Sequence, residues 1–173
     1  MQEPQKLAED ANHVYIYKMP NNDRHFVRSV MTAMTRIQEL LGGEAMTGPL
    51  HDERDIVRLI RRGVSTQSVD HFLSMAGLSF NMLDPTVLNL RTFRRRQKNA
   101  QPLELDESDR LLRLVGIVAA AEETFGNAQK AQTWLHRDNR ALDGETPLAM
   151  VDTDRGVRAV EALLGRIAHG IAA

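Results

Sequence analysis

The chain has 173 residues, of which 42% are hydrophobic and 26% are charged, with a formal net charge of −1. This is an ordinary composition for one globular domain or two small ones, and the absence of cysteine excludes disulfide scaffolds, thiol nucleophiles and cysteine-ligated metal sites. No apolar run approaches the ~18–20 residues of a membrane-spanning helix, and the first residues lack the basic region and apolar stretch of a secretory signal, so we expect a cytoplasmic protein without a membrane partner.

The small net charge hides an uneven distribution along the chain. Residues 51–101 carry 9 Lys and Arg against 5 Asp and Glu, whereas residues 102–173 carry 8 against 12. Residues 1–50 are nearly balanced, with 5 against 6. A basic middle followed by an acidic end indicates two surfaces that bind different partners.

The spacing of apolar residues predicts an all-α fold of roughly 8–9 helices. A strand signal is confined to residues 13–17. Capping residues, glycines and prolines divide the rest into predicted helical segments at 23–41, 52–63, 65–77, 78–87, 89–99, 105–125, 127–135 and 153–171, with a compact helix start at Thr146-Pro147 before the last of them.

Residues 78–98 have the pattern of a helix-turn-helix, in which the second helix lies in the major groove of DNA. Asn89 suits the positive φ that such a turn often needs, and an inward Phe93 would turn the cations of the second helix outward. Arginine neutralises phosphates and matches the acceptors of guanine. The residues that we expect at DNA are Arg91, Thr92, Arg94, Arg95 and Lys98.

Two alternatives remain open for this basic segment. The run of arginines at 94–96 is also compatible with an ordinary solvated helix face, and Asp84-Pro85 could shorten or bend the first helix of the pair. Residues 100–102 form the best boundary in the chain. We therefore predict an N-terminal extension over 1–50 with one helix and a disordered start, a helix-turn-helix domain over 51–101, and a further helical domain over 102–173.

Nothing in the sequence favours catalysis. The six histidines include no pair with the i, i+4 spacing of a helical metal site, and no phosphate-binding or nucleophile motif is present. The carboxylates gather at three predicted helix starts, around residues 52–55, 106–109 and 152–154, where acids cap free amides. We predict no catalytic residue, no metal site and no cofactor.

Residues 106–170 contain a series of marks that a generic helical bundle does not require. In order these are Asp106-Glu107-Ser108-Asp109-Arg110-Leu111, Glu123-Thr124-Phe125-Gly126-Asn127, Lys130-Ala131, Trp134-Leu135, Asn139, Leu142, Gly144, Thr146-Pro147-Leu148, Asp152-Thr153, Gly156, Leu164, Arg166-Ile167 and His169-Gly170. Their order and spacing resemble the toxin-binding domain of the Xre/MbcA/ParS antitoxins. The stretch over 88–96 is similar to the Xre-like N-terminal domains of that family, and the resemblance spans 65–170.

This resemblance implies an antitoxin that binds and neutralises a toxin of the RES fold. Such toxins consume NAD or transfer a group from it. The antitoxin would also repress the operon that it shares with the toxin. It implies operator DNA and the toxin as partners, in a homodimer or a larger assembly with the toxin. The segment from Trp134 onward would contact the toxin, with the end of the last helix nearest the nucleotide pocket. The residues implied at the toxin are Trp134, Asn139, Leu142, Arg166, His169, Gly170 and Ile171.

Each of these marks also has a structural interpretation. Trp134 would serve as core of its own domain, Thr146-Pro147 as a helix cap, Gly156 as a site of close helix packing, and His169 as a solvated residue at a helix end. For the whole chain, the alternative is a helix-turn-helix transcriptional regulator whose C-terminal helices serve dimerisation or sensing and which has no toxin partner.

Overall fold

The computed structural model describes residues 32–83 and 87–170, and every regular element in these ranges is helical. After a helical run at 32–40 come α3 (Glu44–Thr47), α4 (Glu53–Arg62), α5 (Thr66–Ala76), the 3-10 turn η1 (Phe80–Met82), α6 (Leu90–Lys98), α7 (Leu105–Phe125), α8 (Ala128–Leu135), η2 (Arg140–Leu142), η3 (Ala149–Asp152) and α9 (Asp154–Ala168). This confirms the predicted all-α class. The predicted strand at 13–17 and the first part of the helix at 23–41 lie outside the described residues.

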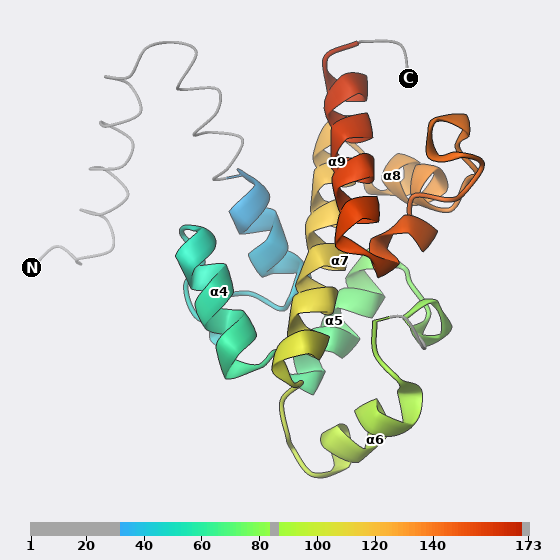
Figure 1. The fold of residues 1–173 in the computed structure, drawn as a ribbon. Coiled ribbons are helices and arrows are strands. Elements are labelled where there is room, and N and C mark those ends of the chain that lie inside the picture. The colour runs from blue at the N-terminus through green and yellow to red at the C-terminus, as the bar shows by residue number, and fades with distance from the viewer. Residues whose placement is uncertain (1–31, 84–86, 171–173) are drawn as a thin grey trace, which may run out of the picture.

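The long helix α7 is the centre of the molecule. Figure 1 shows α4 beside its lower part, α8 and α9 beside its upper part, and α6 at the bottom of the view. The buried residues of α7 lie on more than one face, as expected for a helix surrounded by others. They are Ser108, Leu111, Leu112, Leu114, Val115, Ile117, Val118, Ala119 and Ala121.

The caps predicted from the sequence form most of the helix starts. The side chains of Asp52, Ser65, Asn127 and Thr153 accept hydrogen bonds from the first turns of α4, α5, α8 and α9. These bonds satisfy amide groups that have no partner within their helix. The boundaries could be read from the sequence because each cap is local.

The start of α7 is joined tightly to the turn between α4 and α5. The amide of Leu103 donates to the carbonyl of Val64 at 2.9 Å, and the amide of Val64 donates to the Ser108 hydroxyl at 3.0 Å. Gly63 has a φ of 87°, and a Cβ there would lie 2.4 Å from the Leu103 carbonyl oxygen. Glycine is therefore required by both the backbone conformation and the close approach.

Two expectations about the helix-turn-helix are wrong. Within its described residues, the segment 78–87 forms only the short turn η1 and not the predicted helix. Asn89 has a φ of −71° and is the N-cap of α6, not a left-handed turn residue. Leu83, Val87 and Leu88 are nevertheless buried, so the segment still contributes to the core.

The C-terminal helices pack on α7 through apolar side chains. Val157, Val160, Leu163 and Leu164 of α9 are buried. Gly156 lies so close to η3 that a Cβ there would be 1.9 Å from the carbonyl oxygen of Met150, which confirms the interpretation of this glycine as a close-packing site. None of the helices in the described part of the chain is both long and apolar enough to cross a bilayer.

Candidate functional sites

The basic helix α6 turns a narrow stripe toward the protein. Its start is fixed by Asn89, whose Oδ1 accepts from the amides of Arg91 at 3.0 Å and Thr92 at 3.3 Å. Two of its nine residues, Phe93 and Arg96, are buried. The Phe93 ring packs against Phe80 of η1, with ring centroids 4.9 Å apart. Most of the helix surface is therefore open to a partner.

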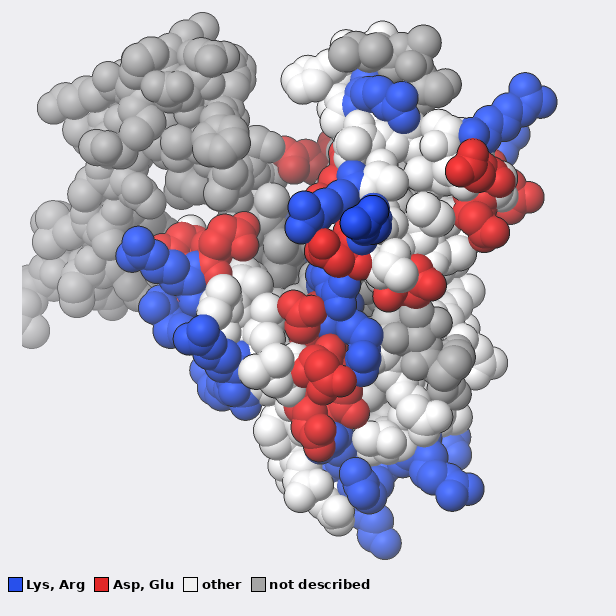
Figure 2. Space-filling model, viewed as in Figure 1, with Lys and Arg blue, Asp and Glu red and all other residues white. Residues whose placement is uncertain are grey.

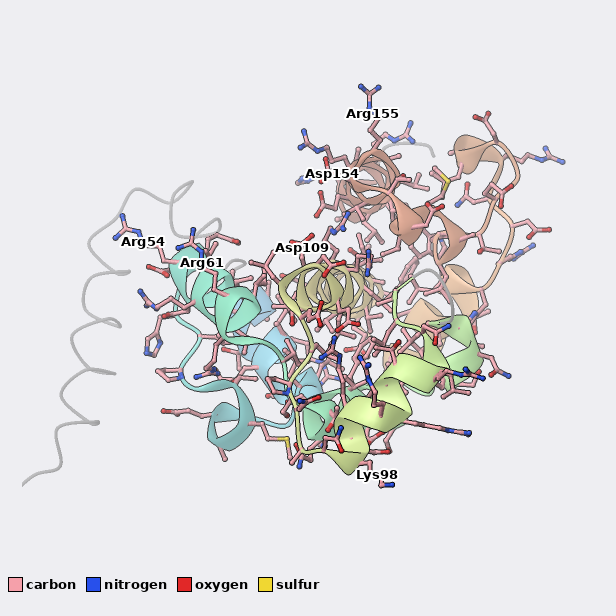
Figure 3. All side chains as sticks on the ribbon, turned by 60° about the horizontal axis from the view of Figure 1, so that its bottom comes forward. Arg54, Arg61, Lys98, Asp109, Asp154 and Arg155 are labelled. Atoms are coloured by element: carbon pink, nitrogen blue, oxygen red, sulfur yellow. The ribbon has the colours of Figure 1, made fainter. Side chains whose placement is uncertain are left out.

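The cations predicted to face DNA lie on this open surface. Arg91, Arg94, Arg95 and Lys98 are exposed, and Thr92 is half-buried. Figure 2 shows one group of basic side chains at the lower end of the molecule, among others elsewhere, and Figure 3 shows Lys98 projecting from the end of α6. Arg91 and Arg94 also line a shallow hollow at the start of the helix together with Asn89 and Leu90. The helix can thus present several cations to one phosphate backbone.

Arg96 differs from its two neighbours. It was not among the residues predicted at DNA, but its partners on α7 were not foreseen. Its side chain is only 8% exposed, and its guanidinium contacts Glu104 at 2.5 Å and Glu107 at 3.0 Å, both at the start of α7. The hydrogen bond to Glu104 raises the pKa of Arg96, against the effect of burial. The available signal was position, since residue 96 follows the inward Phe93 by three and therefore shares its helix face.

A second contact ties α6 to α5. Gln97 donates from Nε2 to Oδ2 of Asp70 at 2.7 Å. Partial burial raises the pKa of the Asp70 carboxyl, and the bond from Gln97 opposes that change. Polar side chains therefore link α6 both to α5 and to the start of α7.

The basic charge of residues 51–101 is divided between two surfaces. Arg54, Arg58 and Arg61 are exposed on α4 at the i, i+4, i+7 positions of one helix face. Figure 3 shows Arg54 and Arg61 on the other side of the view from Lys98, and Figure 2 shows a separate basic line along α4. Arg58 pairs with Asp55 of its own helix, and Arg62 donates to the carbonyl of Thr47. The regional charge excess therefore overstates the charge available at α6.

The C-terminal residues that the family resemblance places in contact with a toxin fall into two groups. The first follows α8. Trp134 is half-buried with its ring centroid 5.5 Å from that of Phe125, and Leu142 is 5% exposed and faces the core. Asn139 accepts from the amide of Ala141 at 2.9 Å and so shapes the loop that continues to the Asp143-Gly144 turn.

The second group lies at the end of α9. Arg166, His169 and Gly170 are exposed, and Ile171 lies outside the described residues. Figure 1 places this end of α9 at the opposite end of the molecule from α6. The two predicted binding regions are therefore spatially separate. No group of three His, Asp or Glu residues within 32–83 and 87–170 is placed to hold a metal ion.

Comparison with known proteins agrees with this division. Residues 55–116 match the family model of the antitoxin Xre-like helix-turn-helix domain, and residues 120–170 match that of the antitoxin Xre/MbcA/ParS C-terminal toxin-binding domain. A Pseudomonas putida protein named Antitoxin Xre is 44% identical over 166 residues, which cover 94% of this chain and 96% of the relative. The chain belongs to the Xre family of antitoxins.

More distant relatives carry related names. An Antitoxin Xre of Photorhabdus laumondii is 38% identical over 85 residues, covering 49% of this chain and 57% of the relative. A Sphingobium protein named Prs ADP-ribosylating antitoxin is 26% identical over 126 residues, covering 67% of this chain and 79% of the relative. Membership in the family confirms the resemblance found in the sequence, and the names support an antitoxin over an enzyme.

The two family models meet inside α7, between residues 116 and 120. This helix therefore belongs to both functional parts of the antitoxin and joins them without a linker. The domain boundary predicted between residues 101 and 102 stays a prediction.

Proposed function

We propose that this antitoxin neutralises a RES-domain toxin that consumes NAD, and that it represses its own operon through α6. The observation that carries the proposal is the match of residues 120–170 to the toxin-binding domain of the family, at the end of the molecule away from the exposed cations of α6. Two separate surfaces allow one chain to hold a toxin and a promoter together.

On the DNA side, the proposed contacts are Arg91, Thr92, Arg94, Arg95 and Lys98. The exposed arginines can release counterions from phosphates and can pair with the O6 and N7 acceptors of guanine. Operators read by such helices are commonly two-fold symmetric, so we propose a homodimer, or a larger assembly with the toxin, as the active form.

On the toxin side, the end of α9 is the proposed contact with the nucleotide pocket. Arg166 offers a planar fork that pairs with carboxylates or with the groups that otherwise bind phosphate. His169, Gly170 and the following Ile171 continue the same end of the chain. The acidic excess of residues 102–173 suits a basic NAD-binding cleft.

The α8 group takes a supporting place in this proposal. Trp134 offers its exposed edge to the toxin, while Asn139 and the buried Leu142 hold the loop beside it in shape. We place the complex in the cytoplasm, where the toxin would find NAD.

Co-expression tests the proposal. Under the proposal, we expect a gene for a RES-domain protein beside this one. That protein should arrest growth when expressed alone, and the antitoxin should restore growth and co-purify with it. Arg166→Glu combined with His169→Glu should abolish rescue but leave operator binding unchanged, and Arg155→Glu, an exposed residue at the opposite end of α9, serves as the control. If the wild-type chain retrieves no such protein, the transcriptional-regulator alternative is favoured.

A further inference from the structure

The recognition helix has little apolar support of its own. Within its nine residues, Phe93 supplies the one buried apolar side chain, which packs against Phe80 of η1 and joins the main core, and α6 also contacts α5. A single buried aromatic side chain leaves the rotation of α6 about its own axis weakly constrained by apolar packing. Polar contacts can supply the missing constraint, and Gln97 to Asp70 of α5 is one of them.

We propose that Arg96 is a positioning residue for DNA recognition, which clamps α6 to the start of α7 and does not itself contact DNA. The inference rests on the proposed operator binding by α6. It assigns different tasks to three consecutive arginines, since Arg94 and Arg95 are exposed whereas Arg96 is buried.

The contacts of Arg96 link α6 to the start of α7 through a short hydrogen bond, an ion pair at Nε that lacks hydrogen-bond geometry, and a long hydrogen bond. Nη2 contacts Oε1 of Glu104 at 2.5 Å, Nε lies 3.0 Å from Oε2 of Glu107, and Nη1 donates to the carbonyl of Pro102 at 3.4 Å. A planar guanidinium with several fixed directions of donation constrains both the angle and the rotation of the helix that bears it. A lysine ammonium at the same position could not reproduce this arrangement.

The acceptors of the clamp are themselves held in place. Glu104 is the N-cap of α7, and its amide donates to Oε2 of Glu107 at 2.8 Å. One turn later, Ser108 accepts from the amide of Val64. Because the buried charge of Arg96 has to remain paired, the clamp resists displacement of α6 from this anchored helix start.

Salt dependence separates positioning from contact. Each cation that neutralises a phosphate adds about one to the slope of log affinity against log salt concentration. Loss of a positioning residue should weaken operator binding without changing that slope, because the exposed cations are all still present. Non-specific DNA binding, which depends on charge more than on geometry, should be largely retained.

Arg96→Met and Arg95→Met make a matched pair for a gel-shift titration on operator and random DNA. We expect Arg96→Met to weaken operator binding about tenfold with an unchanged salt slope and near-normal binding to random DNA. Arg95→Met should lower the slope by about one and weaken binding to both DNAs. An operator affinity equal to wild type, or a slope that falls as in Arg95→Met, would overturn the proposal.

Glu107→Gln provides a second test if Arg96→Met does not fold. Glutamine keeps an acceptor for the Glu104 amide but removes the charge that faces Arg96. We expect a several-fold loss of operator affinity, again with an unchanged slope, and no further loss when Arg96→Met is combined with it. Full additivity of the two losses would refute a shared clamp, whereas failure of the wild-type chain to bind any operator would refute the proposed function instead.

Discussion

Helices α6 and α9 carry the two proposed binding surfaces and are held in the molecule in different ways. Helix α6 buries one aromatic and one arginine, and its contacts with α5 and α7 include two polar links. Helix α9 buries Gly156, Val157, Val160, Leu163 and Leu164. Helix α6 is thus held by one aromatic side chain together with ion pairs and hydrogen bonds, whereas α9 is held by close apolar packing.

This difference predicts which changes each helix tolerates. Ion pairs depend on geometry and charge, so α6 should respond to substitutions that alter either. Apolar packing depends on volume, so α9 should respond to an added or removed methyl group. Substitutions of both kinds can therefore test whether the two regions behave independently.

The largest effect is expected at the exposed cations of α6. Arg94→Ala combined with Arg95→Ala should weaken operator binding, because each lost arginine contact to a base costs about 1–3 kcal/mol, and should flatten the salt dependence. Rescue from the toxin should be unchanged. A gel-shift titration across salt concentrations measures the first effect, and growth in co-expression measures the second.

Arg54→Ala combined with Arg61→Ala is the matched control on α4. These residues are exposed on another side of the molecule and should leave the salt slope unchanged. An equal fall of the slope in both double variants would show that DNA contacts α4 as well as α6.

The close approach of α9 to η3 gives the next largest effect. Gly156→Ala should lower the free energy of unfolding by about 1–3 kcal/mol, because the added methyl group meets the Met150 carbonyl. Gly165→Ala, on the same helix, has no atom within 4 Å of the new Cβ and should raise stability by about 0.5–1 kcal/mol. Urea unfolding compares the two, and equal changes would contradict the packing described for α9.

Asn89→Ala removes the N-cap of α6. We expect a loss of about 1 kcal/mol in the free energy of unfolding, since the amides of Arg91 and Thr92 lose their acceptor. Operator binding should fall while toxin binding is retained. A loss of toxin binding of the same size would show that the two ends are coupled more strongly than the separate packing of α6 and α9 implies.

The smallest effect concerns acid at the start of α4. The hydrogen bond from the His51 amide and the ion pair with Arg58 lower the pKa of Asp55. The ionised carboxylate therefore stabilises the fold at pH values above its unfolded pKa of about 3.9. This stabilisation is lost as the pH falls through the lower pKa of the folded state. Asp55→Asn should therefore be less stable than wild type at pH 7, with the difference shrinking in acid.

Asp70→Asn gives the opposite sign. Its raised pKa means that ionisation of Asp70 costs stability as the pH rises through the folded value, so the asparagine variant should gain relative stability at neutral pH and lose that gain in acid. Urea midpoints at several pH values measure both variants. The same pH trend in both would contradict the assigned environments.

Local signals made most of the fold predictable from the sequence. The caps at Asp52, Asn127 and Thr153 act within one helical turn, and the apolar stripe of α9 repeats at helical spacing. The outward placement of Arg94 and Arg95 followed from one assumption, that Phe93 points inward, and the structure confirms it.

One wrong expectation came from a local ambiguity, and the others came from longer-range structure. An asparagine suits both a helix cap and a left-handed turn, so the sequence alone could not assign Asn89. The spacing of Arg96 from Phe93 indicates its inward face, but its pairing with Glu104 and Glu107 depends on the approach of α7, which spacing alone does not give. The net charge of a region does not show on which side of the molecule each charge lies. For this reason the arginines of α4 and α6 were counted as one surface.

Titration calorimetry of the proposed RES-domain toxin into wild-type antitoxin and into the Arg94→Ala, Arg95→Ala variant tests most directly whether opposite ends of this molecule bind different partners. We expect both proteins to bind the toxin with the same Kd, although the variant no longer binds the operator. Absence of toxin binding by the wild-type chain, or its loss in the variant, would contradict two separate surfaces.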